Sequence, residues 1–257
     1  MSDQPDVHDL LNFLLEYATT LMGVGVHTSR IVRNTSRIAS RFGYVTDITI
    51  FQKTIIMSIR SKESLRVYSS VKRTKVLALN FRINSNLSAL SWRAYDEQLS
   101  LPRIKELYNE IMSEKNMSRW WVLLLVSFAN AAFCRLFMGD VWAMGVVFVA
   151  TLVGFFIRQE MMRRHVNHHF VFVTSAFVAS LIGSLSIFIP ACTTPQIALA
   201  TSVLYLIPGV PLINSIIDII EGHVLVGFTR FVNACMLIIC IAVGLSSTLL
   251  LIGIDSL

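Results

Sequence analysis

The sequence predicts a membrane α-helical protein with five transmembrane helices and an amino-terminal cytoplasmic α+β domain. Hydrophobic residues make up 54% of the 257 residues and charged residues only 15%, whereas soluble domains average about 25% charged residues. The charges also gather early, because residues 1–118 contain 16 Lys and Arg and 11 Asp and Glu, while residues 119–257 contain 6 and 5. We therefore expect a cytoplasmic α+β domain over residues 1–117 and a transmembrane domain over residues 118–257.

The amino-terminal domain begins with a predicted pair of helices. Apolar residues recur at helical spacing over residues 7–42, with a break at Gly23 and Gly25. Short runs rich in Ile, Val, Thr and Phe then predict a small antiparallel sheet. The predicted strands cover residues 47–51, 54–60, 64–69 and 77–82. Two more helices are expected over residues 85–98 and 102–116, because Pro102 suits the first turn of a helix.

The second half of the chain consists of long runs without charged side chains. A helix needs about 20 mostly apolar residues to cross a membrane, and the run 170–217 is long enough for two spans. Five spans are predicted, near residues 119–138, 140–157, 170–189, 196–213 and 231–254. Arg158, Arg163 and Arg164 lie between the second and third spans, and excess positive charge marks the cytoplasmic side. The acidic amino terminus does not fit a cleavable signal sequence, so we expect it to stay in the cytoplasm.

The most informative segment is the fourth span, which we expect to be broken at Pro208–Pro211. Each of these two prolines lacks an amide donor and clashes with the preceding turn. The carbonyl groups that this frees at membrane depth need neighbouring helices or a water-lined cavity, so a broken helix predicts a solute site. Asn214 and Asp218 follow, four residues apart on one helical face. The alternative is a kink that only shapes packing, with Asp218 and Glu221 solvated in a cytoplasmic loop.

The same segment resembles the threonine/serine exporter family. The residues that carry the resemblance run Leu206-Ile-Pro-Gly-Val-Pro-Leu-Ile-Asn-Ser-Ile-Ile-Asp218 and then Glu221-Gly-His-Val-Leu-Val-Gly-Phe-Thr-Arg230. The segment Gly23-Val-Gly-Val-His-Thr-Ser-Arg30 is similar to that family's first motif, and the resemblance covers nearly the whole chain. Further matches occur at Arg119-Trp120, Phe133-Cys134-Arg135 and Ile157-Arg158-Gln159.

The resemblance implies a subunit of a secondary exporter in the bacterial inner membrane. Fused members of the family carry further spans and are associated with threonine and serine, whereas split members place those spans on a separate small protein. This chain is similar to the larger subunit of the split pair that is associated with succinate export. The resemblance therefore implies a small carboxylate solute, either a dicarboxylate such as succinate or threonine and serine, and a smaller membrane subunit as partner.

Two arginines join the residues that we expect to bind the solute. A guanidinium binds a carboxylate through two parallel charge-assisted hydrogen bonds, and Arg135 and Arg230 stand near the ends of predicted spans. The alternative for both is that they reach to the membrane interface as anchors. The expected substrate-binding residues are Pro208, Gly209, Pro211, Asn214, Asp218, Arg135 and Arg230.

Other chemistry is weighed against this expectation. His165, His168 and His169 lack the further ligands of a zinc site, so neither a metal nor another cofactor is expected. The basic amino-terminal domain suits anionic membrane lipids better than nucleic acid. We expect no enzyme, although His27 and Ser29 leave open a membrane-anchored hydrolase with its active site in the amino-terminal domain. A structural or regulatory membrane protein without transport activity is the third hypothesis.

Overall fold

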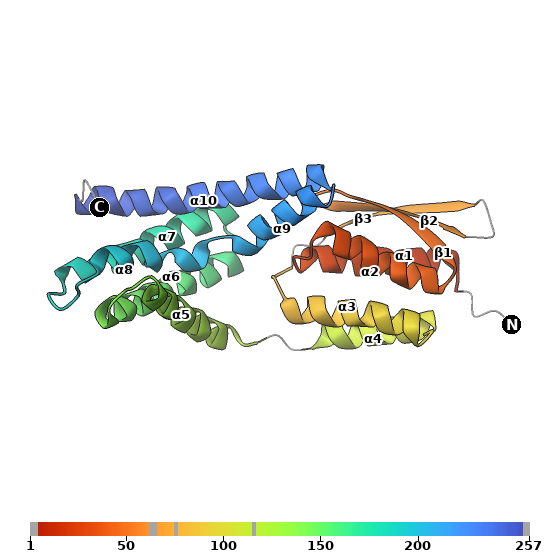
Figure 1. The fold of residues 1–257 in the computed structure, drawn as a ribbon, viewed down its shortest axis with the longest axis horizontal. Coiled ribbons are helices and arrows are strands. Elements are labelled where there is room, and N and C mark those ends of the chain that lie inside the picture. Colours follow the sequence, from red (N-terminus) through yellow and green to blue (C-terminus); the bar gives the residue numbers. More distant parts are fainter. Residues whose placement is uncertain (1–4, 62–65, 75–76, 115–116, 254–257) are drawn as a thin grey trace. The chain divides into compact units, whose positions relative to one another are not determined.

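The computed structural model describes residues 5–61, 66–74, 77–114 and 117–253. Its internal contacts divide the chain into two compact units (Figure 1). The first unit combines Met1–Lys115 with Val210–Val232, and the second combines Asn116–Gly209 with Asn233–Leu257. The first unit therefore contains, beside the amino-terminal residues, a helical hairpin from the last third of the chain.

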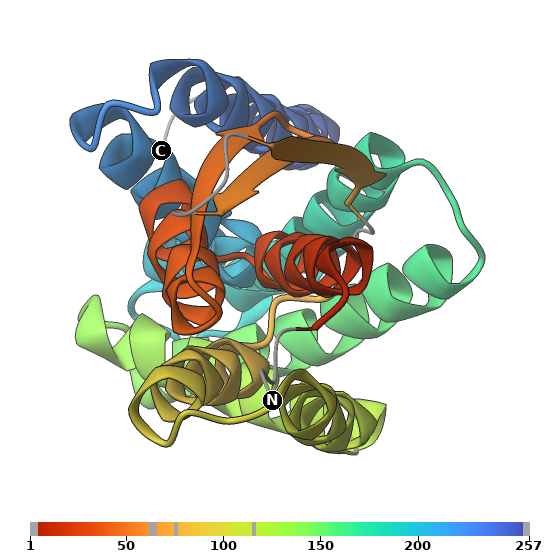
Figure 2. The ribbon, with the colours of Figure 1, turned by 90° about the vertical axis from the view of Figure 1, so that its right-hand side faces the viewer.

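The amino-terminal residues of the first unit form three layers, which are visible in two views (Figures 1 and 2). The helices α1 (Val7–Gly23) and α2 (Thr28–Arg41) form the middle layer. On one side lies an antiparallel sheet in the order β1-β2-β3, with β1 at Tyr44–Ile50, β2 at Thr54–Ser61 and β3 at Val67–Arg73. On the other side lie α3 (Phe81–Asp96) and α4 (Leu101–Ser113). Leucines and isoleucines of the helices and of β2 fill the shared core.

Most of the predicted elements of this region are confirmed, but the strand expected over residues 77–82 is wrong. The side chain of Asn80 accepts a hydrogen bond from the backbone N–H of Ile83 at 3.1 Å and so caps the start of α3. The apolar residues after the cap form the first turn of a helix. The strand expected over 64–69 corresponds to Val67–Arg73, and residues 64 and 65 lie outside the described residues.

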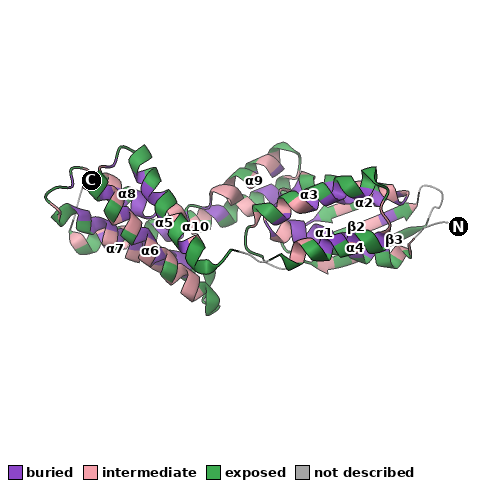
Figure 3. Cartoon of the chain, turned by 90° about the horizontal axis from the view of Figure 1, so that it is seen from below, coloured by how far each residue is buried: buried purple, intermediate pink, exposed green. Residues whose placement is uncertain are grey.

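The second unit is built from long apolar helices. They are α5 (Arg119–Leu136), α6 (Val141–Arg163) and α7 (His168–Ser184), followed by the 3₁₀ turn η1 (Leu185–Phe188), α8 (Pro195–Ser202) and the 3₁₀ turn η2 (Leu204–Leu206). After α9 (Gly209–Ile220) comes α10 (Val224–Ile252), the last helix of the described residues. Exposed residues line the outer sides of these helices (Figure 3), and many of them are large and hydrophobic, such as Phe128, Val149 and Phe170. Such a surface suits lipid.

Within the described residues, four helices are long and apolar enough to cross a membrane. They are Arg119–Leu136, Val141–Arg163, His168–Phe188 and Val224–Ile252, and the bent pair Pro195–Leu206 and Gly209–Ile220 gives a fifth if it counts as one span. This confirms the predicted fold class, a helical membrane protein with a broken fourth span and an amino-terminal α+β region. The break falls at Ile207 and Pro208, so Pro211 lies in the first turn of α9.

Candidate functional site

The candidate site is built on the hairpin formed by α9 and the start of α10. Gly222 has a φ of +88° in the connecting turn, a conformation that ends helices and favours glycine. Gly227 of α10 lies against α9, because a Cβ at this position would lie 2.7 Å from the carbonyl oxygen of Ser215 and 2.9 Å from the backbone nitrogen of Ile219. The missing side chain lets the two helices approach closely, so polar side chains on their facing sides meet.

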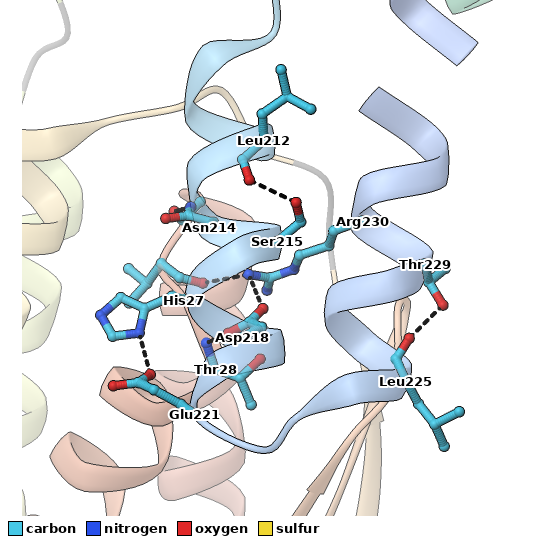
Figure 4. Close-up of polar contacts among 12 residues, drawn as sticks. His27, Thr28, Leu212, Asn214, Ser215, Asp218, Glu221, Leu225, Thr229 and Arg230 are labelled. Atoms are coloured by element: carbon cyan, nitrogen blue, oxygen red, sulfur yellow. Dashed lines mark hydrogen bonds and ion pairs between the residues drawn. The ribbon is translucent and has the colours of Figure 1, made fainter. Parts of the chain in front are cut away.

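Asp218 is the centre of this site, and its side chain is 0% exposed. One carboxylate oxygen accepts a hydrogen bond of 2.7 Å from the backbone N–H of Thr28. Because Thr28 is the first residue of α2, the carboxylate lies at the positive end of a helix dipole. The other oxygen lies 2.9 Å from Nη1 of Arg230 (Figure 4).

Arg230 lies within the first two turns of α10 and divides its contacts. Its Nη1 donates a hydrogen bond of 3.2 Å to the carbonyl oxygen of Val26. Its contact with Asp218 is an ion pair without hydrogen-bond geometry, so Oδ2 of Asp218 accepts no hydrogen bond from the described residues. The pair is electrically neutral, but one buried carboxylate oxygen keeps a free acceptor position.

The segment between α1 and α2 provides the third part of the site. The amide nitrogen of Asn214 donates a hydrogen bond of 2.7 Å to the carbonyl oxygen of Gly25. Gly25 has a φ of +90°, and a Cβ there would lie 3.0 Å from Leu79, so the backbone of this segment depends on glycine. The hairpin side chains Asn214, Asp218 and Arg230 therefore all contact backbone groups of residues 25–28.

Glu221 forms a second polar contact at the turn of the hairpin. Its carboxylate lies 3.2 Å from Nδ1 of His27 and 3.7 Å from Nη1 of Arg33. A hydrogen bond with the Ser29 side chain, together with the charges of His27 and Arg33, lowers the pKa of Glu221 below its ordinary value. Glu221 therefore carries its charge beside amino-terminal residues and does not match the alternative interpretation of the sequence, a residue solvated in a loop.

The same contacts bear on the hydrolase hypothesis. In a serine hydrolase triad the histidine stands between the serine and the acid, so that it can take the proton of the hydroxyl. Here the acid stands between the other two, because His27 and Ser29 both contact the carboxylate of Glu221. These contacts do not have the order of such a triad.

A cavity of about 230 Å³ opens beside these residues in the first unit. Its polar lining residues are Gln52, Thr74, Asn214 and Arg230. Its other lining residues are Met22, Gly23, Gly25, Leu79, Val210 and Pro211. The residues around this cavity thus include one cationic, two amide and one hydroxyl side chain beside apolar ones.

The structure brings four of the seven expected substrate-binding residues together. Pro211, Asn214 and Arg230 line the cavity, and Asp218 pairs with Arg230. Pro208 and Gly209 belong to the second unit, where Pro208 lies in the break and Gly209 is the first residue of α9. Arg135 also belongs to the second unit, where its Nη1 donates a hydrogen bond of 3.1 Å to the carbonyl oxygen of Gly139 at the end of α5. The backbone of residues 25–28 was not expected in the site.

The comparison with protein families identifies the chain. A family model described as "Putative threonine/serine exporter" matches residues 12–252. The chain belongs to the threonine/serine exporter family. Two segments that resemble this family, residues 23–30 and the part of 206–230 that begins at Val210, meet in the first unit.

Two relatives of this exporter family member carry the name "Probable succinate transporter subunit YjjP". The protein from Klebsiella aerogenes is 25% identical over 256 residues, which cover 98% of this chain and 98% of that protein. The protein from Escherichia coli K12 is 29% identical over 187 residues, which cover 72% of this chain and 73% of that protein. No solved structure matches the chain.

Proposed function

We propose that this chain is a subunit of a secondary exporter that carries small carboxylate-bearing solutes across the bacterial inner membrane together with a smaller membrane subunit. The observation that carries the proposal is the position of Arg230. It lines a cavity and at the same time holds a carboxylate, that of Asp218, 2.9 Å from its guanidinium. A guanidinium that already holds one carboxylate has the right chemistry to accept another in its place.

The proposed mechanism is an exchange of carboxylates on Arg230. The solute enters the cavity, its carboxylate takes the guanidinium, and the amide of Asn214 donates a further hydrogen bond. Asp218 then loses its counter-charge in a buried position, where an unpaired charge is strongly disfavoured. A proton from solution therefore joins Oδ2, which has no hydrogen bond to lose. The proton leaves again when the solute departs and the ion pair re-forms, so solute movement and proton movement are coupled.

The solute class follows from the same geometry and from the relatives. One guanidinium and one amide bind the carboxylate of either a dicarboxylate or an amino acid. We favour a dicarboxylate such as succinate, because the relative whose alignment covers 98% of this chain is named a probable succinate transporter subunit. Threonine and serine remain the second candidate through the family.

The test is counterflow in proteoliposomes that contain the chain with and without the small membrane subunit encoded in the same genome. Labelled succinate, threonine and serine are compared at equal concentration. The proposal expects succinate counterflow only when both subunits are present. Because Asp218→Asn imitates the protonated carboxyl group of the solute-loaded state, this variant should keep counterflow but lose the proton-coupled net efflux of succinate. Equal net efflux in wild type and Asp218→Asn would remove the exchange mechanism, and no flux of any of the three solutes would contradict the function.

We also propose that the amino terminus lies in the cytoplasm. The argument is the positive charge of Arg158, Arg163 and Arg164, which lie in the last two turns of α6 and directly after it. Fusions with a fluorescent protein and with alkaline phosphatase, at the amino terminus and within residues 190–194, test it. Alkaline phosphatase activity is expected only for the internal fusion, and activity at the amino terminus would reverse the orientation.

A further inference from the structure

Arg158, an arginine of the second unit, has no negatively charged partner among the described residues. Arg158 lies on α6, and its guanidinium carbon lies 4.9 Å from the ring centroid of Phe172 and 5.6 Å from that of Phe155. Among the described residues it forms no ion pair and no hydrogen bond. Glu160, two residues further along the helix, lies 3.1 Å from Arg164 and 3.9 Å from Arg119 instead. The positive charge of Arg158 can help to orient the chain in the membrane, but this does not explain why its guanidinium is partly buried near two aromatic rings.

Hydroxyl groups without partners lie near this arginine. The phenol oxygen of Tyr205 and the hydroxyl of Ser175 are buried and make no hydrogen bond with the described residues. Gly154, one helical turn before Arg158, brings both neighbours close, because a Cβ there would collide with the Tyr205 hydroxyl and lie 3.3 Å from the carbonyl oxygen of Ser175. The ring of Tyr205 also packs edge-on against Phe155, with centroids 5.9 Å apart. The Tyr205 hydroxyl, a donor without a partner among the described residues, therefore lies against the face of α6 that carries Gly154 and Arg158.

A cavity with space for a ligand lies beside Tyr205. A cavity of about 370 Å³ in the second unit is lined by Tyr205 and Asn130 among apolar residues of α5 and η2. Asn130 donates to Thr151 at 2.6 Å and to the carbonyl oxygen of Thr201 at 3.0 Å, while its own side-chain oxygen is buried and unpartnered. The cavity thus reaches two of the side chains whose polar atoms lack partners.

We propose that Arg158 and Tyr205 form a binding site for one carboxylate group of the solute within the second unit. A cation that is partly removed from water needs an anion, and aromatic faces recover only part of the lost hydration. The guanidinium presents two parallel N–H groups and the Tyr205 hydroxyl a third donor, which together satisfy both oxygens of a carboxylate. The proposal rests on the proposed function for the solute class, but it concerns residues other than those of the α9–α10 hairpin.

The test measures binding separately from transport. The full chain is purified into phosphatidylcholine nanodiscs and titrated with succinate by calorimetry, in a background with Asp218→Asn and Arg230→Gln that removes both charges of the hairpin pair together. Added Arg158→Gln should weaken succinate binding by about 10-fold to 100-fold, and Tyr205→Phe by about fivefold. Arg158→Lys keeps the charge but loses the two parallel N–H groups of the guanidinium, so it should weaken succinate binding less than Arg158→Gln and more than Tyr205→Phe. Arg163→Gln, an exposed arginine of the same helix, is the matched control.

Three outcomes would contradict a solute site at Arg158. Unchanged binding in Arg158→Gln would leave the arginine a membrane anchor, and equal affinity for inorganic phosphate would make it a general anion site, such as one for lipid headgroups. Unchanged binding with loss of co-purification of the small subunit would assign Arg158 to a protein contact. Tyr205→Phe keeps the ring that packs on Phe155, so a fold defect does not obscure its result. Arg158-dependent binding without counterflow would overturn the exporter and leave the site standing.

Discussion

Two arginines on long apolar helices have opposite surroundings in this chain. Arg230 of α10 lies 2.9 Å from Asp218, whose side chain is 0% exposed, whereas Arg158 of α6 lies near two aromatic rings and makes no ion pair with any described residue. The first forms a neutral pair within the protein, and the second leaves a cation for a ligand. The comparison separates a site that must release an internal partner before it binds from one that stands ready for an anion.

The difference has an energetic side. A buried ion pair contributes little net stability, but removal of one partner leaves the other charge buried and costs about 3–5 kcal/mol. Removal of an unpaired, partly buried cation carries no such cost. Variants of Arg230 should therefore change both folding and transport, and variants of Arg158 should change binding alone.

The largest effect is expected for Arg230→Gln. It leaves the fully buried Asp218 without its counter-charge, so the free energy of unfolding should fall by about 3–5 kcal/mol and export should stop. The double variant with Asp218→Asn removes both charges and should recover most of the stability without recovering export. Thermal unfolding in detergent and succinate counterflow measure the two effects.

The control for this prediction is Arg93→Gln. Arg93 pairs with Glu97 on the surface, with about half of each side chain exposed, so its loss should change stability by less than about 1 kcal/mol. A single variant of Arg230 that is as stable as the control would show that the pair with Asp218 does not persist in the membrane.

The sequence predicted the elements of this site better than their partners. The proline break and the four-residue spacing predicted a helix with Asn214 and Asp218 on one face, and α9 has both on the side that meets residues 25–28. The partners could not be predicted, because they are backbone groups about 190 positions earlier in the chain. The periodicity of side chains predicts which face of a helix is polar. It does not predict which backbone groups from a distant part of the sequence will contact that face.

Two other limits of prediction from the sequence are seen at Arg230 and at the run Leu77–Arg82. Arg230 was expected at the entry of the last span, but α10 begins at Val224 and includes the arginine. The prediction began the span after the charged residue, although the mostly apolar residues 224–228 before it already belong to the helix. The run 77–82 has strand composition, yet a single capping side chain, that of Asn80, starts a helix there. Local capping outweighed propensity.

The second prediction concerns the close approach of α9 and α10, on which the Arg230 pair depends. In Gly227→Ala the new methyl group meets backbone atoms, the carbonyl oxygen of Ser215 at 2.7 Å and the nitrogen of Ile219 at 2.9 Å. Backbone cannot rotate away, so the helices must separate, at a cost of about 1–3 kcal/mol. Export should fall with the stability.

Gly145→Ala is the matched control, since a Cβ at Gly145 has open space around it. Alanine there should leave unfolding unchanged or slightly raise its free energy, because alanine favours helix. If Gly227→Ala behaves like this control, the hairpin packs more loosely than the contacts indicate.

The third prediction is the counterpart in the second unit, Gly154→Ala. Here the new methyl group meets the far end of a side chain, the Tyr205 hydroxyl, with Ala179 at 3.0 Å. Because Tyr205 can turn aside, stability should fall by only about 1 kcal/mol, but the hydroxyl leaves its position beside Arg158. Succinate binding measured in nanodiscs should weaken by about the same factor as in Tyr205→Phe. Unaltered binding would separate the hydroxyl from the Arg158 site.

The smallest effect is expected for Glu221, which contacts the amino-terminal residues at the outer end of the hairpin. Its pKa is lowered in the folded state by the Ser29 hydrogen bond and by the charges of His27 and Arg33. A lowered pKa in the folded state means that the carboxylate stabilises the fold above the unfolded value of about 4.3 and that this contribution is lost as the pH falls through the folded value. The difference in unfolding temperature between wild type and Glu221→Gln should therefore be present at pH 7 and shrink toward zero as the pH falls below about 4. Glu110→Gln, on the surface of α4, should show no such convergence, and a difference that persists unchanged in acid would mean that the contacts of Glu221 do not depend on its charge.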